Sequence, residues 1–215
     1  MSKQQKKKGK KSGKRNPSLM GRSDIPFAQR LAMQQSNAIV ANRNHAAKIS
    51  MFTTSVALNE VEGIGYKRLV RYSLHFKEVV DEFYEDPIVG MAHAKHRMEQ
   101  MGMPISGEFY CVKVDGLSRK EQEIHDHALQ ASQVALICAA IAMNDEFGFG
   151  KERQDRINAR RAELAKRYNE EGEQFLLDAL GKIGFEIVGG EARCYMDDND
   201  NIVTPKQFRK EAGNG

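Results

Sequence analysis

Four arginines stand in two matched pairs, each directly after a turn between two expected helices. Arg68 and Arg71 form the first pair, and Arg153 and Arg156 form the second. A spacing of three places both guanidinium groups of a pair on one helical face, where they can bind a planar anion such as phosphate. The commoner use is an intramolecular ion pair that braces the corner between the helices. Acidic partners are available at Glu60, Glu62, Asp145 and Glu146.

The two turns share the pattern Gly-x-Gly, with a hydrophobic residue between the glycines. Gly63 and Gly65 form one turn, and Gly148 and Gly150 form the other. The pattern resembles the helix-hairpin-helix module of DNA repair and replication proteins, in which amides at a helix N-terminus hold a phosphate. The resemblance implies nucleic-acid contact at these glycines. A structural use is also open, with the first glycine ending a helix and the second allowing close packing.

The strongest charge signal is the N-terminal segment 1–22, which has nine Lys or Arg and no acidic residue. Without these nine, the 33 basic residues fall to 24 against 29 acidic ones, so the rest of the chain is net acidic. Since the segment has few large apolar side chains, we expect it to be disordered. It can bind nucleic acid non-specifically through counterion release. The candidate contacts are Lys6, Lys7, Lys8, Lys10, Lys11, Lys14 and Arg15.

No other group of residues has the spacing of a known site. His93 and His96 are three apart, but the repeated segment described below has no equivalent pair. The three cysteines are widely separated and lack the close spacing of a zinc site. No nucleophile and base form a recognisable pair. The sequence therefore predicts no metal, no cofactor and no enzymatic activity.

The elements that position the arginines and glycines occur twice. Residues 56–68 align without a gap with residues 141–153, an offset of 85 that also matches Asn59 to Asn144. A repeat of this kind predicts a duplicated structural unit. Each unit is expected to contain a long helix, the Gly-x-Gly turn, a second helix, a short helix and a short β-stretch. We expect a mainly α fold in which the two units pack as a pseudo-two-fold pair.

The repeat also sets the expected boundaries. Ser118, with Glu121 three residues later, has the spacing of a capping box that begins the long helix of the second unit. Gly102 and Gly184 are expected to end the short helices. The chain is thus divided into a basic tail (1–22), a first helical repeat (23–117) and a second repeat with a C-terminal β-hairpin (118–215). The six expected helices span about 24–59, 66–84, 86–101, 118–144, 151–170 and 172–183, with β-stretches at 108–114, 192–196 and 202–204.

Composition indicates the cellular compartment of the protein. The basic N-terminal stretch is not followed by an apolar segment, so it does not have the pattern of a signal peptide. The longest apolar run, Val134–Met143, is shorter than the roughly 20 residues of a spanning helix. Three isolated cysteines are typical of free thiols in a reducing compartment. We therefore expect a cytoplasmic protein with no membrane partner.

The second turn carries a further resemblance. The segment 142–153, with its Phe-Gly-Phe-Gly-Lys-Glu-Arg ending, resembles a motif of small uncharacterised proteins from phages and prophages of Gram-positive bacteria. The first copy departs from it, with Glu62 and Ile64 in place of the two phenylalanines. The resemblance implies a phage origin and a related fold, without an activity. We predict a non-enzymatic accessory protein of the host-cell cytoplasm that contacts nucleic acid through its tail, with the Gly-x-Gly turns as a second contact. The alternative is a helical module that binds and regulates a host or phage protein.

Overall fold

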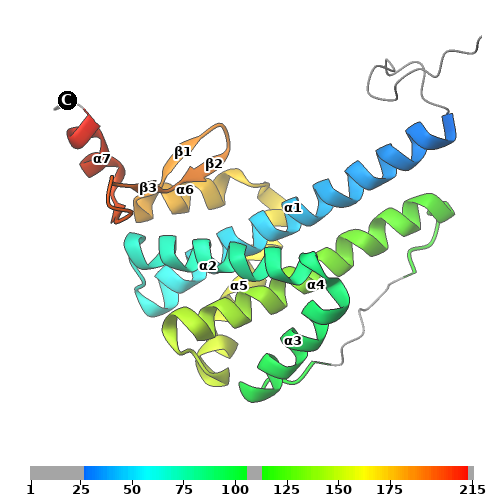
Figure 1. The fold of residues 1–215 in the computed structure, drawn as a ribbon, viewed down its shortest axis with the longest axis horizontal. Helices are drawn as coiled ribbons and strands as arrows, with labels where there is room; N and C mark the ends of the chain where they lie inside the picture. Colours follow the sequence, from blue (N-terminus) through cyan, green and yellow to red (C-terminus); the bar gives the residue numbers. More distant parts are fainter. Residues whose placement is uncertain (1–26, 106–112, 213–215) are drawn as a thin grey trace, which may run out of the picture. The chain divides into compact units, whose positions relative to one another are not determined.

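The computed structural model describes residues 27–105 and 113–212 (Figure 1). The basic tail, with its seven candidate nucleic-acid contacts, lies outside the described residues, as does most of the β-stretch expected at 108–114. The chain divides into two compact units, Met1–Ala38 and Ile39–Gly215. Only the start of the first helix is described in the first unit, and the side-chain contacts below belong to the second. The boundary expected at residues 117–118 stays a prediction.

The mainly α fold is confirmed. The predicted helices all occur, and one more follows near the C-terminus. They are α1 (Phe27–Glu62), α2 (Tyr66–Glu85), α3 (Pro87–Gln100), α4 (Arg119–Phe147), α5 (Lys151–Glu171), α6 (Gln174–Ile183) and α7 (Pro205–Ala212).

Two small antiparallel hairpins follow α6. Strand β1 (Glu186–Val188) pairs with β2 (Glu191–Arg193), with Ile187 opposite Ala192. Strand β3 (Tyr195–Met196) pairs with β4 (Ile202–Val203). The hairpin expected at 192–196 and 202–204 is therefore present in a shortened form, while β1 was not expected.

The helix ends follow local signals in the sequence. The Ser118 hydroxyl accepts a hydrogen bond from the Glu121 amide (3.3 Å), and the Glu121 carboxylate accepts one from the Ser118 amide (2.8 Å), so the predicted capping box is confirmed. Asp86 caps α3 by accepting from two backbone amides, and Pro87 occupies its first turn. Gly184 ends α6 with φ +119°, a conformation that favours glycine.

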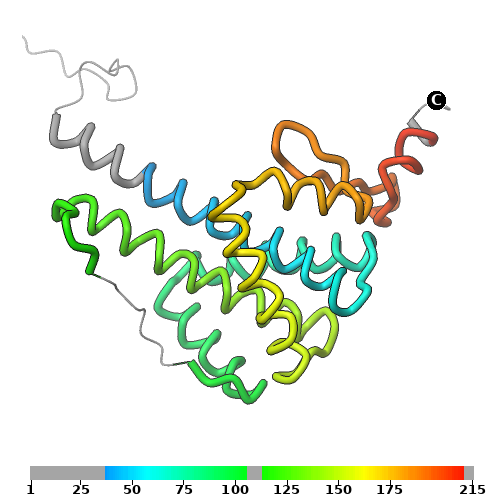
Figure 2. Tube along the Cα trace, turned by 180° about the vertical axis from the view of Figure 1, so that it is seen from behind, coloured from blue at the N-terminus to red at the C-terminus, as the bar shows by residue number. Residues whose placement is uncertain are grey.

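Helix α4 lies at the centre of the core, and its two sides are packed differently. On one side α2 lies along it at close range, with α3 against both. Small buried residues, Ala135, Ala139 and Ala142, permit this approach. On the other side of α4, the backbones of α1 and α5 lie farther from each other than those of α2 and α4 do. Long side chains bridge the space between α1 and α5. Figure 2 shows this side, with α5 in front of α1 and α4.

The internal duplication and its pseudo-two-fold packing stay predictions. The two turns agree closely in local geometry, as described below. The helix pairs that the repeat would relate do not, since α2 lies close to α4 and α5 lies farther from α1. That difference leaves space on the α1–α5 side.

Candidate functional site

The two Gly-x-Gly turns have the same backbone geometry. Gly63 has φ +65° and Gly148 has φ +67°, and each ends its helix by donating its amide to the carbonyl of the preceding Asn59 (3.0 Å) or Asn144 (2.7 Å). Each asparagine side chain then donates to the carbonyl of the residue between the glycines, at 3.1 Å to Ile64 and at 3.3 Å in the second turn. The asparagine and the first glycine thus serve the turn itself.

The second glycine of each turn has no such structural role. Gly65 and Gly150 are the N-cap residues of α2 and α5, with φ −84° and −79°, which any residue can adopt. A Cβ atom at either position would meet nothing within 4 Å, so the expectation that these glycines permit close packing is wrong. Neither helix start has a side-chain cap. In the described part of the chain, both helix N-termini thus lack a side chain that accepts from their first amides.

The four turn arginines all have partners within the chain. Arg71 pairs with Glu146 at 2.9 Å, and Arg156 pairs with Glu62 at 2.8 Å, so each turn binds an arginine from the other copy. The guanidinium of Arg68 lies 4.9 Å from the ring centre of Phe147. Arg153 lies 5.1 Å from that of Phe149. These contacts support the bracing interpretation and hold the two turns side by side.

The bracing pairs contribute little free energy individually. The side chains of Arg71 and Arg156 are 56% and 49% exposed, and pairs with such exposure are worth about 0–1 kcal/mol. Anion contact by the four arginines and four glycines stays a prediction. An anion at Arg71 or Arg156 would have to compete with Glu146 or Glu62, which are already bound there.

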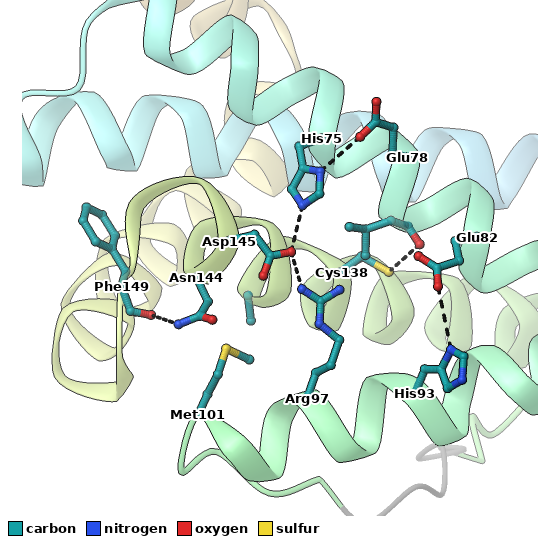
Figure 3. A network of polar contacts seen from close by, with 12 residues as sticks. His75, Glu78, Glu82, His93, Arg97, Met101, Cys138, Asn144, Asp145 and Phe149 are labelled. Carbon is teal, nitrogen blue, oxygen red and sulfur yellow. Dashed lines mark hydrogen bonds and ion pairs between the residues drawn. The ribbon is translucent and has the colours of Figure 1, made fainter.

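A second polar network joins α2, α3 and α4 (Figure 3). Asp145 lies between His75 (2.8 Å) and Arg97, and His75 also contacts Glu78 at 3.1 Å. Partial burial alone would lower the pKa of His75, but its hydrogen bonds to Asp145 and Glu78 raise it above the ordinary value. Burial would raise the pKa of Asp145, but hydrogen bonds from Arg97 and His75 lower it. The network fastens three helices together.

The surroundings of this network contain little space for a ligand. Its nearest hollow, beside Glu82 and His93, has a volume of only about 20 Å³. Burial raises the pKa of the Cys138 thiol to about 12, so this buried thiol is not a nucleophile at neutral pH. Over the described ranges, no group of three His, Cys, Asp or Glu residues is arranged to hold a metal ion.

A cavity lined in part by the buried Arg161 lies between α1, α4 and α5, with part of α3 and the residue Met103. It has a volume of about 640 Å³, a size typical of small-molecule sites. Its walls are mostly apolar, with polar groups at intervals. The lining residues are Asn42, His45, Ala46, Ile49, Ser50, Thr53, Met98, Met103, Ala128, Ser132, Leu136, Ile137, Ala140, Asn158, Arg161, Ala162, Ala165, Tyr168 and Asn169. We refer to it as the α1–α5 cavity.

Arg161 is the unusual residue of this cavity. It is only 5% exposed, and its guanidinium donates to the hydroxyl of Ser50 (3.0 Å) and to the side-chain oxygen of Asn158 (3.1 Å). Both acceptors are neutral. Its Nε has no hydrogen-bond partner among the described residues, and no carboxylate in the described part of the chain pairs with it.

The neighbours of Arg161 do not supply a counter-charge. Burial lowers the pKa of Arg161, yet an arginine remains protonated at neutral pH. Burial raises the pKa of nearby Tyr72 to about 12, against the influence of Arg161, so the phenol stays neutral. The adjacent Arg160, by contrast, pairs with Glu60 (2.6 Å) and Glu163 (2.5 Å). The chain thus has one paired and one unpaired arginine at consecutive positions.

The sequence prediction missed Arg161, although a signal for it exists. In α5 the buried residues are Gln154, Ile157, Arg161 and Leu164, at spacings of three, four and three. A charged residue on that apolar stripe is the exception to the helical pattern. Ser50 and Asn158, which orient it, have no such signal, because they meet Arg161 only in the folded chain.

Comparison with known protein-family models, curated proteins and solved structures finds no match. Among the described residues, no helix is long and apolar enough to cross a membrane.

Proposed function

We propose that the helical body is a non-enzymatic binding protein that holds a small organic anion in the α1–α5 cavity. The observation that carries this proposal is the buried Arg161, which lines the cavity and has no counter-charge among the described residues. Burial of an unpaired charge costs several kcal/mol. An incoming carboxylate, sulfonate or phosphate would offset that cost through charge-assisted hydrogen bonds.

The repeat alignment supports a ligand over a purely structural role. At the offset of 85, Arg161 corresponds to Phe76, which is 2% exposed and belongs to the core. The predicted repeat thus places a hydrophobic residue at the matched position of the first unit. Stability alone would favour a second hydrophobic residue over a buried cation.

Two hydroxyls of the cavity, those of Ser50 and Thr53, are not arranged as nucleophiles. The Ser50 hydroxyl donates to the Ala135 carbonyl (3.2 Å), and the Thr53 hydroxyl donates to the Ile49 carbonyl (2.8 Å). Neither hydroxyl is hydrogen-bonded to a side chain that can act as a base, which an activated nucleophile needs.

The experiment uses anilinonaphthalene sulfonate, an apolar anion that fluoresces on leaving water, with the wild type, Arg161→Met and Arg160→Met. Both variants lose one positive charge, but only the first changes the cavity. We expect saturable binding to the wild type and to Arg160→Met, and binding at least tenfold weaker to Arg161→Met, as loss of a charged hydrogen bond requires. Equal binding to all three proteins would overturn the proposal.

We also propose a second function, non-specific nucleic-acid contact through residues 1–22. The observation that favours it is the run of nine basic residues without an acidic one. The helix starts at Gly65 and Gly150, which lack a side-chain cap, offer a further contact for a phosphate, while the turn arginines already have partners. Duplex and single-stranded DNA should bind the full chain less tightly at higher salt, and removal of residues 1–22 should abolish this binding. Absence of salt-dependent binding by the full chain would refute this function.

A further inference from the structure

We infer that the ligand of the α1–α5 cavity is an aliphatic monocarboxylate, with its carboxylate on Arg161 and its chain directed along α5 toward Tyr168. This inference rests on the proposed anion-binding function and specifies the chemical class of the ligand. It follows from the charge of the cavity, from the position of the backbone amides and from the order of residues along the helices.

The charge of the cavity suits one negative charge. Arg161 is the only Lys or Arg among its described lining residues. The one other basic group, His45, is hydrogen-bonded to the Tyr168 hydroxyl at 3.0 Å. A single guanidinium matches a carboxylate, whose two oxygens can accept from two guanidinium N–H groups together. Nε has no partner among the described residues but is itself enclosed, whereas Nη2 uses only one of its two hydrogens on Ser50 and is the first donor for the carboxylate.

The backbone around the cavity does not suit a phosphate. Phosphate sites usually include free amides at a helix N-terminus or in a glycine-rich loop. The lining residues of α1, α4 and α5 begin at Asn42, Ala128 and Asn158, each well beyond the start of its helix. Their amides are used within the helices. A nucleotide is disfavoured further, because Tyr168 is the only Phe, Tyr or Trp among the described residues that line the cavity, and its ring lies against His45.

The path of the ligand's alkyl chain follows from the contacts between α1 and α5. Arg161 meets Ser50 toward one end of the cavity, which continues to Thr53 and Asn158, and Tyr168 meets His45 at the other end. Ala165 lies between them on α5. The seven residues from Arg161 to Tyr168 span roughly 10 Å along the helix, about the length of an extended eight-carbon chain. Apolar residues line this path, namely Ala46, Ile49, Leu136, Ile137, Ala162 and Ala165.

The polar residues at the far end of the path limit the length of the alkyl chain that the cavity can bury. Asn42, His45, Tyr168 and Asn169 form a polar rim there. Methylene groups that reach the rim gain little from leaving water, whereas each one buried before it contributes about 0.8 kcal/mol. The affinity should therefore rise by about fourfold per added methylene and then level off near eight carbons.

The test is calorimetric titration of the full chain with butanoate, hexanoate, octanoate and decanoate, and with octanol and octyl phosphate at the octanoate length. We expect the rise and the plateau described above, with octanol at least tenfold weaker than octanoate and octyl phosphate weaker as well. Affinity independent of chain length would overturn the inference, as would tighter binding of octyl phosphate or equal binding of octanol.

Two variants locate the chain within the cavity. Ala165→Phe fills the path one turn beyond Arg161; because a helical side chain leans toward the preceding turn, its ring also comes near the guanidinium. It should weaken octanoate binding at least tenfold and acetate binding by a clearly smaller factor. Ala159→Phe, at an exposed position of the same helix outside the cavity, is the matched control and should leave octanoate binding unchanged. If Ala165→Phe, with an unaltered circular dichroism spectrum, binds octanoate like the wild type, the chain does not follow this path.

Different results would overturn the anion-binding function and the monocarboxylate ligand. Arg161-dependent binding of anilinonaphthalene sulfonate that octanoate does not displace would overturn the monocarboxylate and leave the anion-binding function standing. Absence of any Arg161-dependent binding, of the sulfonate or of the carboxylates, would overturn both.

Discussion

Replacement of Arg161 by methionine is expected to stabilise the ligand-free protein. The methionine keeps most of the apolar stem and removes a charge that is 5% exposed and has no counter-ion in the described part of the chain. Replacing buried charged groups by hydrophobic ones of similar volume stabilises proteins by about 1–4 kcal/mol in measured cases.

The lost hydrogen bonds offset part of that gain. Ser50 keeps its own bond to the Ala135 carbonyl, and Asn158 is only partly buried, so both acceptors lose little. We expect a net increase of about 1–3 kcal/mol in the free energy of unfolding. At about 2–4 °C per kcal/mol for a chain of this size, the melting temperature should rise by roughly 2–12 °C.

The assay is urea unfolding followed by circular dichroism, together with calorimetric melting, for the wild type, Arg161→Met and Arg160→Met. Arg160→Met removes half-exposed ion pairs to Glu60 and Glu163. Its free energy of unfolding should therefore be unchanged or fall by up to about 1 kcal/mol. A loss of more than 1 kcal/mol in Arg161→Met, with an unchanged denaturant slope, would refute the reasoning. Arg161 would then be a structural residue.

Three further predictions test other parts of the fold. Gly148→Ala, at φ +67°, should lower the free energy of unfolding by about 1 kcal/mol or more, whereas Gly150→Ser, with open space and a capping hydroxyl, should be neutral or slightly stabilising by urea midpoint. If the two variants lose the same stability, the turn geometry is wrong. His75 has a raised pKa in the folded state, so its stabilisation is complete below the unfolded value near 6.5 and is lost as pH rises through the folded value; His75→Gln should lower the melting temperature at pH 5.5 and much less at pH 8. Equal losses at both pH values would contradict the charged contact with Asp145. The Cys138 thiol should resist iodoacetamide at pH 8 until urea unfolds the chain, as followed by mass spectrometry of its peptide, and rapid native labelling would show that it is not buried.

The helices were predictable because their signals are local. The capping box at Ser118 and the turn glycines act within a few residues of each helix end, and the structure has the expected geometry at both. The extra helix α7 also had a local signal. The Thr204 hydroxyl and the Gln207 side chain form a second capping box at its start, and this spacing was overlooked.

The arrangement of charges was not predictable in the same way. The sequence provided both arginines and carboxylates at the turns, but Arg71 binds Glu146, more than seventy residues away, and not a residue of its own turn. The isolation of Arg161 depends likewise on how α5 lies against α1. The spacing of residues predicts which of them share a face of one helix. It does not predict how two helices pack, so it cannot predict a cavity between them.

The unequal neighbours of α4 have a consequence for how this chain can change over time. Its alanine-rich side, packed against α2, holds much of the buried core, so substitutions there should be poorly tolerated. The side facing α5 carries the cavity and contributes less buried contact. Residues such as Leu136 and Ala162 can therefore vary in size with modest loss of stability, which leaves this half of the protein free to acquire new ligands while the other half preserves the fold.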